Sequence, residues 1–305
     1  MRIRQRVVSI AIPILALSAL ALMLGAVPAQ AASLAFVQSS SADPQTSPTS
    51  LTVTYAAAQT AGNLNVVIVG WNNATALISS VTDSKGNAYV LAVGPTVQAG
   101  VATQAIYYAK NIASAAAGTN IVTVTFNAAA SFPDIRIAEY SGVDTVNPVD
   151  VVAANQGSTS SSSSGAVTTT NANDLLVAGN VIQTLTTGAG TSFTKRVITS
   201  PDGDILEDRI VTATGSYTGT APVSPAGQWI MQMVAFRAAG GGSGPGITTL
   251  NPTSGTIGVS VTITGTNLGS SQGGSTVTFN GTTATPTSWN ATTIVVPVPT
   301  GATTG

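Results

Sequence analysis

Short runs of β-branched and aromatic residues recur along most of the chain, and each run is bounded by Gly, Asn, Ser or Pro. LTVTY (51–55), TNIVTVTF (119–126) and QWIMQMVAF (228–236) are clear examples. Such runs favour strands, whereas Ala-rich patches such as ASAAAG (113–118) are too short for helices. The pattern predicts an all-β fold, with a large jelly-roll-like β-sandwich over residues 32–238.

The two halves of the large domain resemble each other in sequence. AGNLNVVIVG (61–70) reads like ANDLLVAGNV (172–181), and the two halves end on the apolar runs DIRIAEYSG and QWIMQMVAFRA. Both NLNVVIVG and DLLVAGNV are apolar on two faces, as expected of central strands in a sheet that is covered on both sides. Because each half is too short to bury a good core alone, we expect two related halves in one sandwich. The serine-rich stretch 158–164 is then an exposed loop between them, although it also resembles a linker between domains.

Distinct segments mark the two ends of this domain. Residues 1–31 combine the basic MRIRQR, a long apolar run and Ala29-Gln30-Ala31, the pattern of a cleaved signal peptide. An uncleaved membrane anchor is the alternative, because the apolar run is longer than usual. No second run reaches membrane-spanning length, so we expect no span in the mature chain and a secreted or cell-surface location.

AAGGGSGPG (238–246) has the composition of a flexible linker. We therefore predict a signal peptide at 1–31, the large sandwich at 32–238, a linker at 239–246 and a second domain at 247–305.

Composition excludes several kinds of chemistry. The 305 residues include neither Cys nor His, which removes disulfides, thiolate nucleophiles, Cys-based zinc sites and the commonest general base. Three of the ten basic residues are Arg2, Arg4 and Arg6; without them, seven basic against eleven acidic residues give a net charge of −4. This balance lacks the basic stripe that binds phosphate backbones, so no nucleic-acid partner is expected.

The C-terminal segment has turn and strand signals of its own. Pro252, Gly255 and Gly258 in NPTSGTIG (251–258) predict a bent loop. The following VSVTITG alternates apolar and hydroxyl side chains, as a half-buried strand does. Asn280-Gly281 is a type I′ hairpin signal, and Trp289 is expected to pack inside the sandwich.

Three stretches together resemble the IPT/TIG domain, an immunoglobulin-like fold: ITTLNPTSGTIGVSVTITGTNLG (247–269), STVTFNGTTAT (275–285) and SWNATTIVVPVPTGATTG (288–305). Family members normally continue into one more strand. The resemblance therefore implies either a fragment of a longer protein or a module whose last strand is missing.

IPT/TIG modules occur in cell-surface receptors, in transcription factors and beside catalytic domains of polysaccharide-acting enzymes. The predicted signal peptide argues against a role in a transcription factor. The resemblance implies a non-catalytic extracellular binding, adhesion or structural module of a bacterial protein, with an extracellular protein or a glycan as partner. The alternative is a carbohydrate-binding accessory region of a larger polysaccharide-acting enzyme.

Two sets of side chains are candidates for ligand binding. Exposed aromatic rings can stack on sugars, and the aromatic candidates are Trp71, Tyr107 and Tyr108; their apolar neighbours also fit a place in the core. Oxygen atoms bind calcium, and the calcium candidates are Asp202, Asp204, Glu207 and Asp208 in SPDGDILED (200–208). The alternative for the acidic set is a β-turn, Pro201-Asp202-Gly203, followed by a strand.

No residue is assigned a catalytic role, and no cofactor other than calcium is expected. A glycosidase would need paired carboxylates, and Glu139 and Glu207 occupy late positions in the two halves. A buried Glu139 paired with Arg136 or Lys110 is the alternative. A Lys–Asn isopeptide crosslink would have to use Lys85, Lys110 or Lys195.

Overall fold

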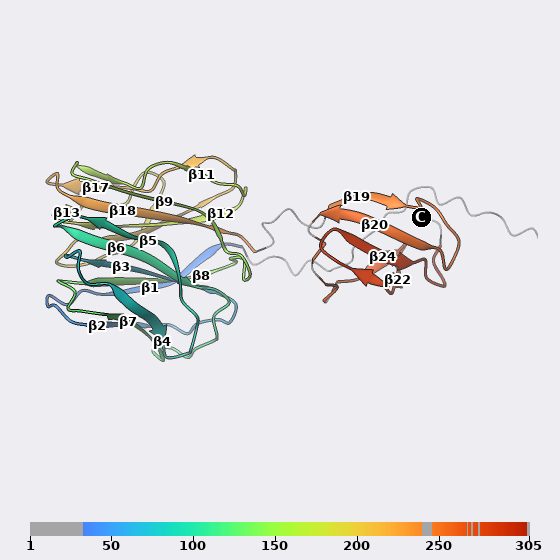
Figure 1. Ribbon diagram of the computed structural model, residues 1–305, viewed down its shortest axis with the longest axis horizontal. Helices are drawn as coiled ribbons and strands as arrows, with labels where there is room; N and C mark the ends of the chain where they lie inside the picture. Colours follow the sequence, from blue (N-terminus) through green and yellow to red (C-terminus); the bar gives the residue numbers. More distant parts are fainter. Residues whose placement is uncertain (1–32, 240–245, 267, 270, 274, 304–305) are drawn as a thin grey trace, which may run out of the picture. The chain divides into compact units, whose positions relative to one another are not determined.

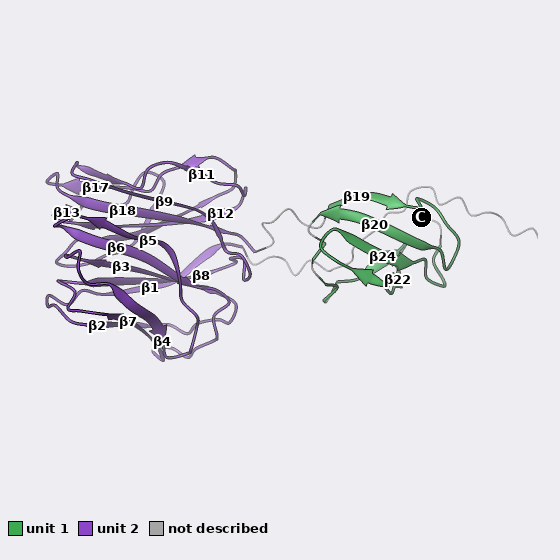
Figure 2. Cartoon of the chain, viewed as in Figure 1, with its two compact units in different colours: residues 1–29, 243–305 green, residues 30–242 purple. Residues whose placement is uncertain are grey.

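The computed structural model describes residues 33–239, 246–266, 268–269, 271–273 and 275–303, which fall into two compact units (Figures 1 and 2). The predicted signal peptide and most of the predicted linker lie outside these residues. Every regular element within them is a strand, β1 to β24, and the sheets are antiparallel. The all-β fold class is confirmed.

The first half of the large unit is a two-layer sandwich. One sheet has the order β1-β8-β3-β6-β5 and the other the order β2-β7-β4. Its strands are β1 (Ala35–Ala42), β2 (Ser50–Tyr55), β3 (Leu64–Trp71), β4 (Ile78–Asp83), β5 (Val90–Gln98), β6 (Ala102–Ala109), β7 (Asn120–Phe126) and β8 (Asp134–Ser141). This is the strand order of a jelly roll, except that β5 pairs with β6 at the edge of the larger sheet.

The second half repeats this order. Its sheets run β9-β18-β12-β15-β14 and β10-β17-β13, with a small additional sheet β11-β16. The strands are β9 (Val149–Gly157), β10 (Ser161–Ser163), β11 (Val167–Thr168), β12 (Asp174–Ile182), β13 (Leu185–Thr186), β14 (Thr194–Ile198), β15 (Ile205–Val211), β16 (Ser216–Tyr217), β17 (Thr220–Ser224) and β18 (Trp229–Arg237). Each strand of the larger sheet thus has a counterpart in the first half, with β3 matching β12 at the centre.

The large unit has more layers than a single sandwich. Each half encloses its own apolar core, around Trp71 in the first and around Met231 in the second. The two five-stranded sheets then pack face to face over a third core, which includes Ile68 and Phe236, so that four layers are stacked (Figure 1). All residues of β3 and of β12 are buried because each strand lies between two covered faces.

The two central strands meet through complementary side chains. A β-carbon added at Gly179 would lie 2.6 Å from Cδ1 of Ile68, and one added at Gly70 would lie 3.0 Å from Cγ2 of Val181. In the repeat alignment Ile68 corresponds to Gly179 and Gly70 to Val181. Each contact therefore sets a bulky residue of one half against a glycine at the same position of the other half.

The C-terminal unit is a smaller sandwich with its own core around Ile263, Phe279 and Ile294. Its sheets run β19-β20-β24-β23 and β21-β22. The strands are β19 (Gly246–Asn251), β20 (Ser260–Thr266), β21 (Val277–Phe279), β22 (Thr282–Ala284), β23 (Ser288–Trp289) and β24 (Thr293–Pro297).

The local expectations for this unit agree with its geometry. Val261 and Ile263 are buried, whereas the side chains between and beside them are more exposed. Asn280 and Gly281 both have positive φ, 43° and 84°, at the turn between β21 and β22, as a type I′ turn requires. Trp289 packs against the core and donates its indole N–H to the carbonyl of Leu268 at 2.8 Å.

Candidate functional site

The structure places Trp71 in the core of the first half. Only 1% of its surface is exposed, its ring meets the ring of Phe126 edge-on at 5.4 Å, and its Nε1 donates to the carbonyl of Ala76 at 3.1 Å. A side chain in this position contributes to packing and is out of reach of a ligand at the surface.

Tyr107 and Tyr108 are half-buried neighbours on β6 and face opposite sides of their sheet. Tyr107 packs against the core of the first half, and Tyr108 packs between the halves, edge-on to Phe236 at 5.7 Å. Tyr108 also lines a shallow hollow with Lys110, Pro148 and Arg237. The three aromatic candidates therefore do not form one platform.

The acidic candidates are also divided between surfaces. Asp202 lies in the turn before β15, next to Asp43 and Gln45. Asp204 and Asp208 face the first half, while Glu207 points into the interior of the second half. Among the described residues there is no group of three or more acidic side chains arranged to hold a metal ion.

Two of the predicted sites occupy the same positions of the repeat. Tyr107 pairs with Val67 of β3, and Glu207 pairs with the corresponding Ala178 of β12. Tyr108 and Asp208 are related in the same way through Val66 and Val177. Two of the aromatic candidates and two of the acidic candidates therefore occupy the same pair of repeat positions, which the two halves fill differently.

Asp208 links the two halves through Arg196. The guanidinium of Arg196 forms a bidentate pair with Asp208, at 2.7 and 2.9 Å, and lies 3.9 Å above the ring centre of Phe36 in β1. Bidentate pairing and stacking both use the planar shape of arginine. Asp208 thus has a structural partner.

Glu207 and Glu139 lie in separate halves and have different surroundings. Glu139 is fully buried and accepts hydrogen bonds from Asn63 at 2.6 Å, Gln38 at 2.7 Å and the backbone N–H of Thr60 at 3.3 Å. It is paired with neither Arg136 nor Lys110. Its three donors tie the loop before β3 to β1 and β8.

Glu207 accepts one hydrogen bond, from the backbone N–H of Gly190 at 2.7 Å, and its Oε1 has no partner among the described residues. Burial raises the pKa of this carboxyl from 4.5 to about 8, and the hydrogen bond from Gly190 opposes the shift. A carboxyl in such surroundings is protonated at neutral pH.

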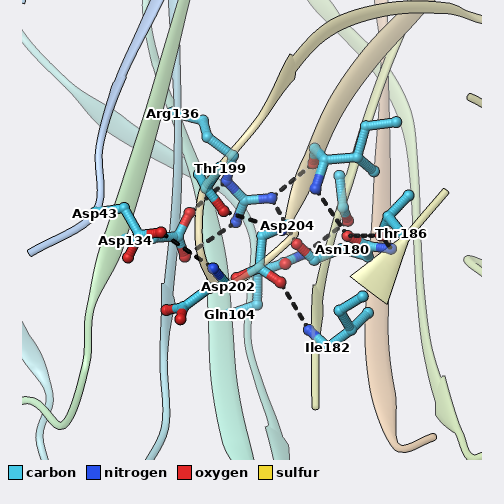
Figure 3. Close-up of polar contacts among 12 residues, drawn as sticks. Asp43, Gln104, Asp134, Arg136, Asn180, Ile182, Thr186, Thr199, Asp202 and Asp204 are labelled. Atoms are coloured by element: carbon cyan, nitrogen blue, oxygen red, sulfur yellow. Dashed lines mark hydrogen bonds and ion pairs between the residues drawn. The ribbon is translucent and has the colours of Figure 1, made fainter. Parts of the chain in front are cut away.

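A buried cluster of charged residues lies where the two halves meet, and the sequence analysis did not predict that its members lie together. Asp134 and Arg136 of β8 meet Asp204 at the start of β15, and all three are at most 2% exposed (Figure 3). Arg136 Nε lies 2.6 Å from Asp134 Oδ2, and its NH1 donates to the carbonyls of Asn180 and Ile205 at 2.5 and 2.6 Å. The signal was present in DIRIAEYS, where Asp134 and Arg136 are two residues apart and therefore fall on one face of the strand.

A second acidic pair lies at the far end of β12. Asp174 is buried against Asp150, whose carboxylate also pairs with Arg237 at 3.0 Å and accepts the backbone N–H of Thr170 at 2.6 Å. Burial and the neighbouring Asp150 raise the pKa of Asp174 to about 7. This pair too is enclosed by the fold.

One exposed surface of the large unit is unusually uniform. The outward side chains of β2, β7 and β4 form aligned rows, with Thr52, Thr123 and Thr82 side by side in the middle row. We call this surface the hydroxyl face; it comprises Ser50, Thr52, Thr54, Ser80, Thr82, Ile121, Thr123 and Thr125. Neighbouring strands are about 4.8 Å apart, so the face is a regular grid of hydroxyl and methyl groups without a charge.

The fold defines a class of all-β proteins built from stacked antiparallel sheets, in which buried polar groups hold the layers together. In the C-terminal unit the class can be named more closely: residues 245–305 match the family model of the IPT/TIG domain. The C-terminal unit is therefore an IPT/TIG domain, an immunoglobulin-like module that is typically non-catalytic and mediates interactions. No curated protein and no solved structure matches the chain.

The described residues contain no helix of the length and apolarity needed to span a bilayer. The IPT/TIG segment also has a property that bears on its partners, because no Asp, Glu, Lys or Arg occurs after Arg237. Neither the hydroxyl face nor the described part of the IPT/TIG domain carries a charged side chain.

Proposed function

We propose that this chain is a non-catalytic extracellular binding module of a bacterial secreted or cell-surface protein, and that it contacts an uncharged, hydroxyl-rich partner. The observation that carries the proposal is the hydroxyl face. Solvent-exposed sheet faces of soluble proteins usually include charges, whereas this face has none over three strands. Neutral polysaccharide has the matching chemistry, since each sugar hydroxyl can donate to and accept from a threonine or serine.

The predicted signal peptide and the IPT/TIG domain support the extracellular setting. N-terminal sequencing of the exported protein should find Ala32 as its first residue. A mature chain that retains residues 1–31 would instead support the anchor alternative.

The binding proposal is tested by co-sedimentation of the full chain with insoluble neutral polysaccharides such as cellulose and chitin. Binding through uncharged groups should change little between low and high salt, because screening acts on charges. Thr123→Lys places a charge in the middle of the hydroxyl face and should reduce retention about tenfold, a loss of about 1.4 kcal/mol.

Ser161→Lys is the matched control, because Ser161 is exposed on the corresponding outer sheet of the second half. It should leave retention unchanged. The proposal fails if neither polysaccharide retains the chain, or if both lysine variants act alike. It also fails if the chain hydrolyses a polysaccharide and loses that activity in Glu139→Gln or Glu207→Gln.

A further inference from the structure

The contact between the two halves encloses two carboxyl groups and one guanidinium. β8 of the first half supplies Asp134 and Arg136, and the second half supplies Asp204 together with two backbone carbonyls that accept from Arg136 (Figure 3). A β-carbon at Gly70 would come within 2.5 Å of Asp134 Oδ1. The cluster is therefore tightly enclosed.

A hydrogen bond between the carboxyl groups of Asp134 and Asp204 requires a proton on one of them. The carboxyl groups of Asp134 and Asp204 are both buried beside the guanidinium of Arg136 and lie within hydrogen-bonding reach of each other, and two ionised carboxylates have only acceptors to offer. Asp204 Oδ1 already accepts the backbone N–H of Ile182 at 2.8 Å. One carboxylic acid, one carboxylate and one guanidinium then sum to zero charge, which suits a site without water.

The charged groups around the pair reinforce this state. Apart from Arg136, the ionisable side chains facing it are Asp43, which follows β1, and Asp202, in the turn before β15. Burial raises the pKa of Asp134 to about 6, against the opposing effect of Arg136. Burial, followed by the charge of Asp134, raises the pKa of Asp204 well above its usual value.

The same contact has a neutral counterpart. Arg136 pairs with Ile68 in the first half, and Gln232 pairs with Gly179, the equivalent of Ile68, in the second half. Gln232 is therefore the repeat counterpart of Arg136. In the same way, Gln104 is the counterpart of Asp204. Gln104 donates to Gln232 Oε1 at 3.2 Å and to the carbonyl of Gly179 at 2.8 Å, and Gln232 donates to the carbonyl of Gln104 at 3.0 Å. The halves therefore pack through amides on one side and through ionisable groups on the other.

We propose that Asp134 and Asp204 hold a single shared proton, and that this proton couples the packing of the two halves to pH. Loss of the proton to solvent leaves two carboxylates beside one guanidinium in a buried site. The contact between β8 and β15 then loosens, while the glutamine side of the joint is unaffected. The device is independent of the proposed binding function.

The test is equilibrium unfolding of the full chain by urea between pH 4 and pH 9. The folded state retains a proton that the unfolded state releases near its ordinary pKa of 3.8. The contribution of this proton to the free energy of unfolding is thus fully present at low pH. It is lost as the pH rises through the raised pKa values that the pair has in the folded state. The folding constant should fall about tenfold per pH unit for each such proton. In Asp204→Asn the amide donates to Asp134 at every pH. The pH dependence of the folding constant should therefore be less steep in this variant, by the contribution of one proton.

Glu207 and Asp174 also titrate with raised pKa values, so the comparison is made in a Glu207→Gln, Asp174→Asn background. Carboxyl carbon NMR shifts of the wild-type chain provide a second readout if Asp204→Asn does not fold. One aspartate carboxyl of the pair should remain protonated at pH 5. Ionisation of both Asp134 and Asp204 at that pH, or an unchanged slope in Asp204→Asn, overturns the proposal.

Discussion

Glu139 and Glu207 show how two residues of one type come to have opposite roles in two related halves. Glu139 accepts hydrogen bonds from three donors, so the fold supplies partners for its carboxyl oxygens. Glu207 has a single donor and one oxygen without a partner among the described residues, so its neutral form suits the site. The difference follows from the number of N–H groups within reach.

The same substitution should therefore have opposite effects at these two positions. Glu139→Gln turns an NH₂ group toward donors and should cost about 1–3 kcal/mol of stability, both at pH 5 and at pH 9. Glu207→Gln should cost little near pH 5 and should stabilise the protein relative to wild type above pH 8, where the wild-type carboxyl, with a pKa of about 8, has to ionise. Urea unfolding at pH 5 and pH 9 measures both effects; equal losses for the two variants at both pH values would contradict this assignment.

At the scale of strands, β3 and β12 determine how the halves fit together. Their all-apolar pattern correctly indicated coverage on both faces. The glycines within them are explained only by the structure, because Gly179 accommodates Ile68 and the carbonyl of Ile205 lies 2.8 Å from its added β-carbon. A glycine in a strand interior marks a close approach of this kind.

Gly179→Ala should therefore destabilise the large unit by about 1–3 kcal/mol, because the new methyl group meets backbone as well as the Ile68 side chain. Gly188→Ala is the matched control, since nothing lies within 4 Å of its added β-carbon. Thermal unfolding followed by circular dichroism compares the two. Similar melting temperatures for both variants would show that the sheets separate readily to admit a methyl group.

Element by element, the sequence predicts more of the fold than of the site. Alternation and turn residues suffice for β20 and the β21–β22 hairpin, because these depend on local backbone preferences. The layer count does not follow from such preferences, since it depends on which faces meet. The burial of Trp71 and the pairing of Asp208 with Arg196 do not follow from local preferences either. An aromatic or acidic residue on a strand has the same sequence pattern whether a second sheet or water covers it.

For the whole molecule, the separate cores of the two units lead to a prediction about cooperativity. We propose the domain boundary at the glycine-rich segment 239–246, beyond which the IPT/TIG core around Ile263 begins. A chain ending at residue 239 should unfold with the same melting temperature and enthalpy as the large unit in the full chain. Differential scanning calorimetry measures both; a shift of the large-unit transition on truncation would show that the two units stabilise each other.

The pairing of Ile68 with Gly179, and of Val181 with Gly70, has a consequence for the history of the chain. A protein built from two first halves would bring isoleucine against isoleucine at its centre, and one built from two second halves would leave a void there. Once a duplicated ancestor had acquired these reciprocal shapes, neither copy could replace the other. A change of side-chain size at either position of this joint would therefore need a compensating change in the other half.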